Sequence, residues 1–308
     1  MRRFGLAVVC VAFCTLPAIA QQSTVAPARQ ALSDAWWTGP MLAASAATLP
    51  GGHILVEPYL LDTVSSTTND YGTLTYLLYG VTNRFTAGVT VTSGYIATAR
   101  GTGSAGMAFG DTTAIVQYGL TQFREGNPVP ATALVFEETI PTGRYDDLGD
   151  RPNDATGAGA YTTSLGIYTQ KYFWLPNGRI VRARFDLLQS FSRRVAVQGA
   201  SVYGTDTAFQ GAAYPGASSY VDLAGEYSAT RNWVPALDVT YRYAANTRVV
   251  NAGGLATGLG SSAAYAFAPA IEYNWAATWG VLLGTRIVPK GHNALPSTTP
   301  ALAIDFVR

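Results

Sequence analysis

Long stretches of the chain alternate apolar and polar residues with a period of two. Between residues 181 and 187 the apolar set is Val181, Ala183, Phe185 and Leu187, and the polar set is Arg182, Arg184 and Asp186. Residues 236–243 and 265–275 repeat the pattern, with one aromatic or aliphatic face and one small or polar face. Successive side chains of a β-strand point to opposite faces, so this period predicts strands. A helix over 180–191 would scatter the same apolar residues around its axis.

The same alternation predicts twelve strands. They lie near residues 52–62, 73–81, 84–96, 110–122, 129–140, 160–172, 178–193, 218–230, 233–244, 262–275, 277–288 and 297–307. Most are longer than the five or six residues usual for strands of soluble proteins, and they match the roughly 9–11 residues that a tilted membrane strand needs. Strand length therefore favours a membrane barrel over a soluble β-sandwich, in which a second sheet would have to cover the apolar face.

The connections between these strands alternate in length. Short, turn-rich connections fall at 81–84, 124–128, 174–178, 231–232 and 274–275, and long ones at 63–72, 97–109, 141–159, 194–217, 245–261 and 289–296. Outer-membrane barrels have short periplasmic turns and long outer loops. The expected fold is therefore all-β: a transmembrane antiparallel up-and-down β-barrel of about 12 strands.

The chain divides into three segments. Arg2 and Arg3, an apolar run to about Leu16 and the small residues Ala18-Ile19-Ala20 predict a secretory signal peptide over residues 1–20. Residues 21–50 are expected to form a periplasmic N-terminal tail, and residues 51–308 a barrel in the bacterial outer membrane. The longest uncharged stretch, 249–271, is interrupted by Gly, Ser and Asn and does not predict a spanning helix. A chain that is 48% hydrophobic must then bury its apolar side chains in a core or present them to lipid as a closed barrel.

Charge and motifs exclude several function classes. Without Arg2 and Arg3 the chain has 18 basic and 19 acidic residues, which gives no electrostatic case for nucleic acid. The aspartates of the loop 141–159 lack the spacing of a calcium-binding EF-hand, so we expect a solvated loop, with calcium as the alternative. The sequence GTGSAG at 101–106 matches a dinucleotide-binding pattern, but a strand rather than a helix follows it. We expect no cofactor and no metal site.

Charged residues on the predicted strands share one face. Turning Arg182 and Arg184 toward lipid would cost roughly 2–4 kcal/mol each near the bilayer midplane, so we place this face in the lumen. The expected pore-lining residues are Glu57, Glu137, Arg182, Arg184, Asp186, Asp222, Glu226, Asp238, Arg242, Glu272 and Arg286, with Asp305 on the same face. Both signs are interspersed, which predicts paired charges in a narrow bore; we prefer structural pairing to specific ligand binding.

Aromatic residues mark one end of the predicted barrel. Trp174, Trp233, Trp275 and Trp279 lie at or beside short turns, and Trp36-Trp37 precedes the first strand. This places all six tryptophans at the periplasmic end and predicts an interfacial girdle of the first four. Phe306 in the last strand is typical of the signal recognised by the barrel-assembly machinery, although Val307 and Arg308 follow it.

Three stretches carry a family resemblance: FGDTTAIVQYGL at 109–120, PTGRYDD at 141–147 and ATGAGAYTTSLGIYTQKYF at 155–173. In this order they resemble the bacterial outer-membrane transporter family named "MetA-pathway of phenol degradation". The resemblance covers roughly residues 50–308. It implies an outer-membrane barrel associated with uptake of aromatic or other hydrophobic small molecules, and it brings no catalytic residues.

Three functions follow as hypotheses. The first is a channel for passive uptake of small hydrophobic or aromatic solutes, whose partners are the solute, outer-membrane lipid and lipopolysaccharide, and the assembly machinery. A closed structural or adhesive barrel that acts through its outer loops is the alternative. An outer-membrane lipid hydrolase using His292 with a loop serine such as Ser297 is the third, although His53 and His292 fall at opposite ends and no G-x-S-x-G motif is present. We expect no enzyme.

Overall fold

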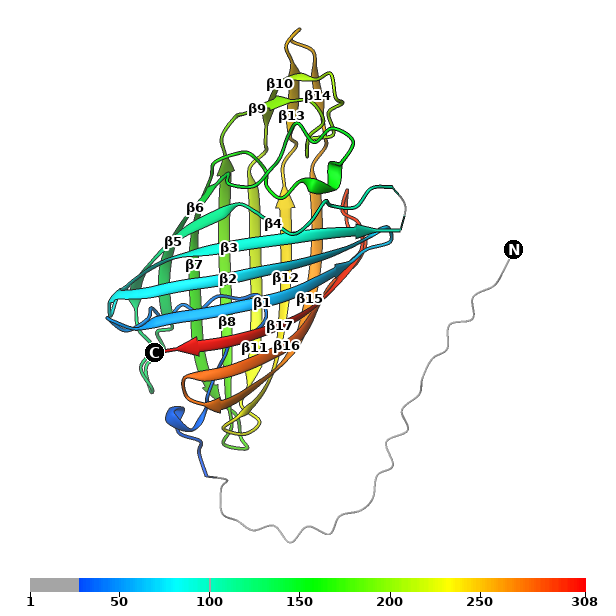
Figure 1. Cartoon of the computed structure of the whole chain (residues 1–308). Helices are drawn as coiled ribbons and strands as arrows, with labels where there is room; N and C mark the ends of the chain where they lie inside the picture. Colours follow the sequence, from blue (N-terminus) through cyan, green and yellow to red (C-terminus); the bar gives the residue numbers. More distant parts are fainter. Residues whose placement is uncertain (1–27, 100) are drawn as a thin grey trace.

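A computed structural model describes residues 28–99 and 101–308, so the expected signal peptide lies outside the described residues. Twelve long antiparallel strands close into a barrel (Figure 1). They are β1 (Ile54–Val64), β2 (Thr68–Thr82), β3 (Phe85–Thr98), β5 (Thr112–Thr121), β6 (Ala131–Ile140), β7 (Thr162–Trp174), β8 (Ile180–Ser192), β11 (Ser218–Tyr227), β12 (Trp233–Ala244), β15 (Ser262–Ala276), β16 (Trp279–Val288) and β17 (Ser297–Val307). The seam joins β1 to β17, with Tyr59 opposite Ala303.

The predicted all-β barrel of twelve strands is confirmed, and its first outer connection is corrected. The expected loop 63–72 is only a turn at residues 65–67, because β1 continues to Val64 and β2 begins at Thr68. Thr68, Asn69 and Asp70 are typical turn residues, yet they pair with Thr98, Ala97 and Ile96 of β3. Pairing on both sides therefore overrides the local preference of these residues.

Alternate residues of each strand face the interior and the outside. On β16, Leu282 is fully buried whereas its neighbour Leu283 is 60% exposed. Leu60, Leu165 and Leu223 are also exposed on the outer surface of other strands. No second sheet covers these side chains in the part of the chain that the structure describes, which rules out the β-sandwich alternative there. The outer surface is the apolar band expected of a membrane barrel.

The outer loops are folded rather than extended. β9 (Val195–Gln198), β10 (Gln210–Tyr214), β13 (Arg248–Asn251) and β14 (Ala256–Gly258) form a second sheet in the order β14-β13-β10-β9. β9 follows β8, β10 precedes β11 and β13 follows β12, so this sheet extends three neighbouring barrel strands outward (Figure 1). We call residues 194–214 and 245–261 the tower. The short strand β4 (Ala108–Phe109) and the 3-10 turn η2 (Pro152–Asp154) belong to other outer loops.

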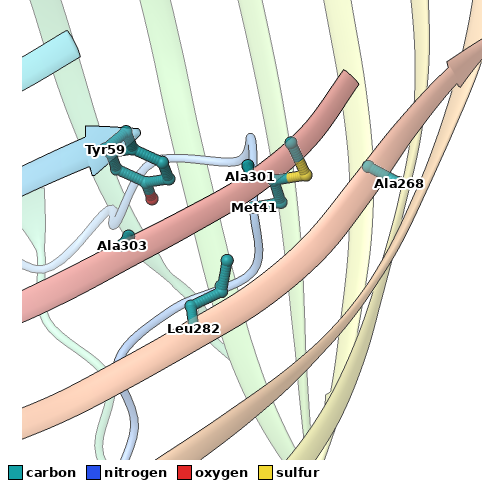
Figure 2. Packing of buried hydrophobic residues seen from close by; sticks show 6 residues of the cluster. All are labelled: Met41, Tyr59, Ala268, Leu282, Ala301 and Ala303. Carbon is teal, nitrogen blue, oxygen red and sulfur yellow. The ribbon is translucent and has the colours of Figure 1, made fainter. Parts of the chain in front are cut away.

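The N-terminal segment lies inside the barrel. The residues on either side of the 3-10 turn η1 (Leu32–Asp34) bond to two short turns of the barrel. Gln30 N–H donates to Gly178 O, and Trp36 N–H donates to Arg231 O. The chain then crosses the interior and returns to the same end, where Thr48 Oγ1 donates to Asn83 O. Figure 2 shows Met41 packed among Tyr59, Leu282 and Ala301 of the wall. We call residues 35–49 the inner belt.

In the described part of the chain, no helix has the length and apolarity to cross a membrane.

Candidate functional site

Three interior carboxylates hold the inner belt through its backbone. Glu272 Oε2 accepts the N–H groups of Thr38 and Gly39, at 2.8 and 3.1 Å. Asp238 accepts those of Met41, Leu42 and Ala43 at 3.0, 3.3 and 2.9 Å. Asp186 Oδ2 accepts the N–H of Ala44 at 2.7 Å. Together the three side chains accept six backbone N–H groups, so they fix an extended segment that has no secondary structure of its own.

Neutral side chains continue this attachment around the wall. Gln170 Oε1 accepts the N–H of Ala46 at 3.2 Å, and Gln117 Nε2 donates to Ser45 O at 2.8 Å. The N–H of Leu49 donates to Thr86 Oγ1 at 2.9 Å. From Thr38 to Leu49 the wall partners lie on β15, β12, β8, β7, β5 and β3, so the inner belt follows the wall strand by strand.

The sequence makes room for the inner belt with small inward-facing residues. Ala266, Ala268, Ala301 and Ala303 are buried on β15 and β17. On β16 a Cβ at Gly284 would lie 3.1 Å from Met41 Sδ, and a Cβ at Gly280 would overlap Thr38 Oγ1. The small or polar face predicted for residues 265–275 carries Glu272 and was therefore placed in the lumen. The small side chains on this face leave the volume that the inner belt fills.

One buried ion cluster lies beside the inner belt. Glu226 pairs with Arg182 in a bidentate contact and with Arg184 at 3.1 Å. Arg184 Nη1 also donates to Ala43 O at 2.9 Å, and the Arg182 guanidinium lies 4.6 Å from the Trp37 ring centroid. Such a cluster costs desolvation energy that its hydrogen bonds must offset, so removing one member leaves a buried charge without a partner.

The expected lumen residues all lie on inward-facing positions, but most are not paired with opposite charges. Among the described residues, only Arg182, Arg184 and Glu226 of this set form ion pairs within 4 Å, and they form them with one another. Tyrosine hydroxyls donate to three others: Tyr59 to Glu57, Tyr168 to Glu137 and Tyr220 to Asp222. The Arg242 guanidinium lies 5.6 Å from the Tyr220 ring, and Arg286 is half-buried on β16. The expectation of interspersed ion pairs is therefore corrected, because backbone N–H groups and hydroxyls take the place of cations.

Several interior carboxylates keep one oxygen without a hydrogen-bond partner. These atoms are Asp186 Oδ1, Asp222 Oδ1, Glu272 Oε1 and Asp305 Oδ1. An unsatisfied buried oxygen costs about 1–3 kcal/mol, so each of these four positions favours an additional hydrogen-bond donor. The interior thus has spare acceptor capacity around the inner belt.

The aromatic residues divide into two groups. Trp233, Trp275 and Trp279 are exposed on the outer surface, and Trp279 packs against Phe306 with ring centroids 4.4 Å apart and the ring planes tilted by 40°. Trp174 has the inward-facing register and differs from these three, since its Nε1 donates to Gln30 O and its ring lies 4.0 Å below the Arg29 guanidinium. Its contacts are with the N-terminal segment rather than with the outer surface. Trp37 lies inside the barrel, between Arg182 and Tyr172.

A cavity of about 380 Å³ opens between the inner belt and the wall. Its aromatic walls are Trp37, Phe123 and Tyr172, and Leu32, Ala46 and Ala131 add apolar surface. Gln170 and Gln122 supply polar groups. It lies at the end of β5 and β7, near the short turns. A mostly apolar cavity with a few polar groups is typical of a small-molecule site.

The motif-bearing outer loop is held by one aspartate. Asp111 Oδ1 accepts the N–H of Gly143 at 2.9 Å, and Oδ2 accepts that of Ala158 at 2.8 Å. A Cβ at Gly157 would overlap Asp111 Oδ1, which explains the glycine of the Thr-Gly motif. The three stretches that carried the family resemblance therefore meet at one structural junction.

The aspartates of loop 141–159 also act as hydrogen-bond acceptors. Asp146 accepts from Gln198 N, and Asp154 from Ala105 N. Within the described residues no group of three or more metal-ligating side chains occurs. His53 precedes β1 near the short turns, whereas His292 pairs with Ala263 in an outer connection. The two histidines therefore lie at opposite ends of the barrel.

Sequence reasoning missed the inner belt and its neutral partners. Gln117, Gln170 and Asn274 lie at inward positions of predicted strands, where an amide needs hydrogen-bond partners. These inward-facing amides were the sequence signal that could have indicated a segment bound inside the barrel. The order of the partners around the wall has no counterpart in the sequence pattern.

Comparison with known proteins supports the fold. No protein-family model matches the chain, and no curated protein matches it. The COG4313 outer membrane channel from Pseudomonas putida F1 superposes with a TM-score of 0.68 at 13% identity, covering 87% of this chain and 100% of that chain. The NanC and KdgM porins give TM-scores of 0.45 and 0.41 at 10% identity, each covering 82% of this chain and 98% of the porin. The chain thus has the fold of an outer-membrane β-barrel.

Proposed function

We propose that the protein is an outer-membrane channel for passive uptake of small hydrophobic or aromatic solutes. The cavity beside the inner belt carries this proposal, because Trp37, Phe123 and Tyr172 give it faces suited to a flat apolar ring. Its volume of about 380 Å³ is at the small end of the range for ligand sites and fits a one- or two-ring solute.

The outer half of the interior supports a path to this cavity. Small hydroxyl residues face inward there in cross-strand pairs, including Thr113–Thr139 and Ser164–Ser190 at 2.9 and 2.8 Å. We propose that these short polar side chains line the route from outside to the inner belt. A solute that enters from outside meets a wet, weakly binding surface first and the apolar cavity last.

The exposed aromatic residues near the short turns support placement of the barrel in an outer membrane. Trp233, Trp275 and Trp279 are proposed to lie at the periplasmic headgroups, and Phe306, which packs against Trp279, to be the assembly signal.

A closed barrel that acts through its outer loops is the second candidate. The occupied interior and the folded tower favour it. It predicts no solute flux, whereas the channel predicts flux that depends on the cavity.

Solute flux into liposomes separates the two. Purified protein should raise the permeability to phenol, and Phe123→Asp should reduce this gain severalfold because the cavity becomes polar. Phe109→Ala is the matched control, since Phe109 is 74% exposed on an outer loop. No gain with any small solute would favour the closed barrel.

A further inference from the structure

The base of the tower carries a row of cationic and aromatic side chains. Tyr214 of β10 lies opposite Arg248 of β13, whose guanidinium carbon is 4.6 Å from the Tyr214 ring centroid. Arg194, just before β9, places its guanidinium carbon 6.0 Å from the same ring. Next to it in the sequence, Arg193 lies 5.9 Å from the ring of Tyr161. Two tyrosines thus hold three guanidinium groups.

No ion pair within 4 Å neutralises these three arginines in the part of the chain that the structure describes. Within residues 28–99 and 101–308, ion pairs form at Arg29, Arg144, Arg182, Arg184 and Arg231. Arg193, Arg194 and Arg248 form none, and no carboxylate oxygen lies within 4 Å of them. Like charges close together repel, and an anion between them would remove that repulsion. The rings fix the guanidinium planes, which lowers the entropy cost of binding.

The row faces away from the barrel mouth. Val195, Ala213 and Val249 alternate with Arg194, Tyr214 and Arg248 along the same strands and pack against Ala160 and Tyr203 of the loops. Figure 1 shows the loop bearing η2 between the tower and the β3–β4 end of the wall. Because side chains of a strand alternate between faces, the arginines lie on the opposite, outer side.

The row also lies at a defined height above the apolar band. On the outer surface of β8 and β11, Leu187 is exposed and pairs with Val221, whereas the next outward pair is polar, with Ser219 Oγ donating to Gln189 at 2.6 Å. Arg194 follows Gln189 by five residues, at most about 17 Å along a strand. Phe191, which is 51% exposed on the same face of β8, is the last apolar side chain below the row. The row therefore lies just beyond the apolar surface, where the headgroups of an outer leaflet are expected.

We propose that Arg193, Arg194, Tyr214 and Arg248 bind the phosphate groups of the phosphorylated glycolipid in the outer leaflet, which is lipopolysaccharide in a Gram-negative envelope. A guanidinium matches two phosphate oxygens at once, and the ring beneath it leaves both donors free. The site rests on the outer-membrane placement proposed above and is separate from the solute cavity.

Titration of the full-length protein in detergent tests the site. Deep-rough lipopolysaccharide should bind, and the same glycolipid without phosphates should bind far more weakly. The double variant Arg194→Gln/Arg248→Gln should lose about tenfold or more in affinity, because two charge-assisted contacts are removed. Arg124→Gln on a periplasmic turn is the matched control and should bind as the parent protein does. Arg194→Lys/Arg248→Lys should retain part of the affinity and guards against misfolding.

Several results would overturn the proposal. Equal binding by the Gln double variant, or by the dephosphorylated glycolipid, would show that these arginines do not recognise phosphate. Displacement by inorganic phosphate at the same concentration would make the site one for a free anion. Phenol flux into liposomes, measured on the same samples, should be unchanged by the Gln variant, so this site and the proposed channel can fail independently.

Discussion

Ala43 donates its backbone N–H to Asp238 Oδ1 at 2.9 Å, and the same carboxylate holds Met41 and Leu42. Replacing Asp238 by Ala should therefore release the inner belt locally, at a cost of about 1–3 kcal/mol for each N–H group left unsatisfied. We expect faster proteolysis within residues 35–49 and higher ion conductance in planar bilayers. Asp206→Ala in the tower is the control, and an unchanged conductance with an unchanged cleavage rate would contradict the role of Asp238.

Gly280 provides the space for Thr38. A Cβ at this position would overlap Thr38 Oγ1 and also lie close to Asn274 Oδ1. Gly280→Val should displace the N-terminal end of the inner belt and lower the thermal midpoint, whereas Gly225→Ala, with open space around its Cβ, should be nearly silent. Thr38→Ala should partly rescue Gly280→Ala. Absence of rescue would mean that the strain lies in Asn274 instead.

Two exposed arginines attach the N-terminal segment to the short turns. Arg29 pairs with Glu125 at 2.5 Å, and Arg231 pairs with Asp34 and lies 5.3 Å from the Trp36 ring. Exposed pairs contribute about 0–1 kcal/mol, so Arg29→Ala/Arg231→Ala should leave the thermal midpoint almost unchanged. It should make cleavage of the segment before Trp36 faster, and high salt should reproduce this effect in the parent protein. A salt-independent cleavage rate in the parent would argue against these ion pairs.

Asp111 joins the motif-bearing stretches. Asp111→Ala leaves the N–H groups of Gly143 and Ala158 without their acceptor, so we expect the loop 141–159 to become protease-sensitive while the barrel strands stay protected. The expected cost is about 1–3 kcal/mol of local stability. Asp150→Ala, an exposed position in the same loop, is the matched control. Equal cleavage of both variants would contradict the role of Asp111.

Ionisation of Tyr203 should destabilise the outer loops at high pH. Burial, with smaller effects from Tyr145 and Asp111, raises the pKa of Tyr203 to about 12. Its hydroxyl donates to Ala158 O at 2.6 Å. The unfolded tyrosine ionises near pH 10, so the stabilisation is complete below pH 10 and is lost as the pH rises toward 12. Tyr203→Phe should flatten this dependence of tower proteolysis. A cleavage rate of the parent protein that does not change between pH 10 and 12 would contradict this role of Tyr203.

The wall of the barrel could be predicted from sequence, but its contents could not. The alternation along Val181–Leu187 sets the strand and its two faces, because lipid on one side and a packed interior on the other select each residue separately. Residues 35–49 have no such period. Their conformation depends on carboxylates such as Glu272 that lie more than 200 residues away. The tower was missed for a similar reason, since β9, β10 and β13 are short and are stabilised by loops packed against them.

The attachment of the inner belt has a consequence for how the polypeptide assembles. The separations in sequence increase overall from its C-terminal end, from 37 residues for Leu49–Thr86 through 124 for Ala46–Gln170 and 142 for Ala44–Asp186 to 234 for Thr38–Glu272. Loop-closure entropy rises only slowly when each new contact builds on the previous one. A nascent sheet that grows from β3 toward β15 can therefore bind this segment one contact at a time, from its C-terminal end to its N-terminal end. Pairing of β1 with β17 then closes the barrel and encloses the segment as the final step.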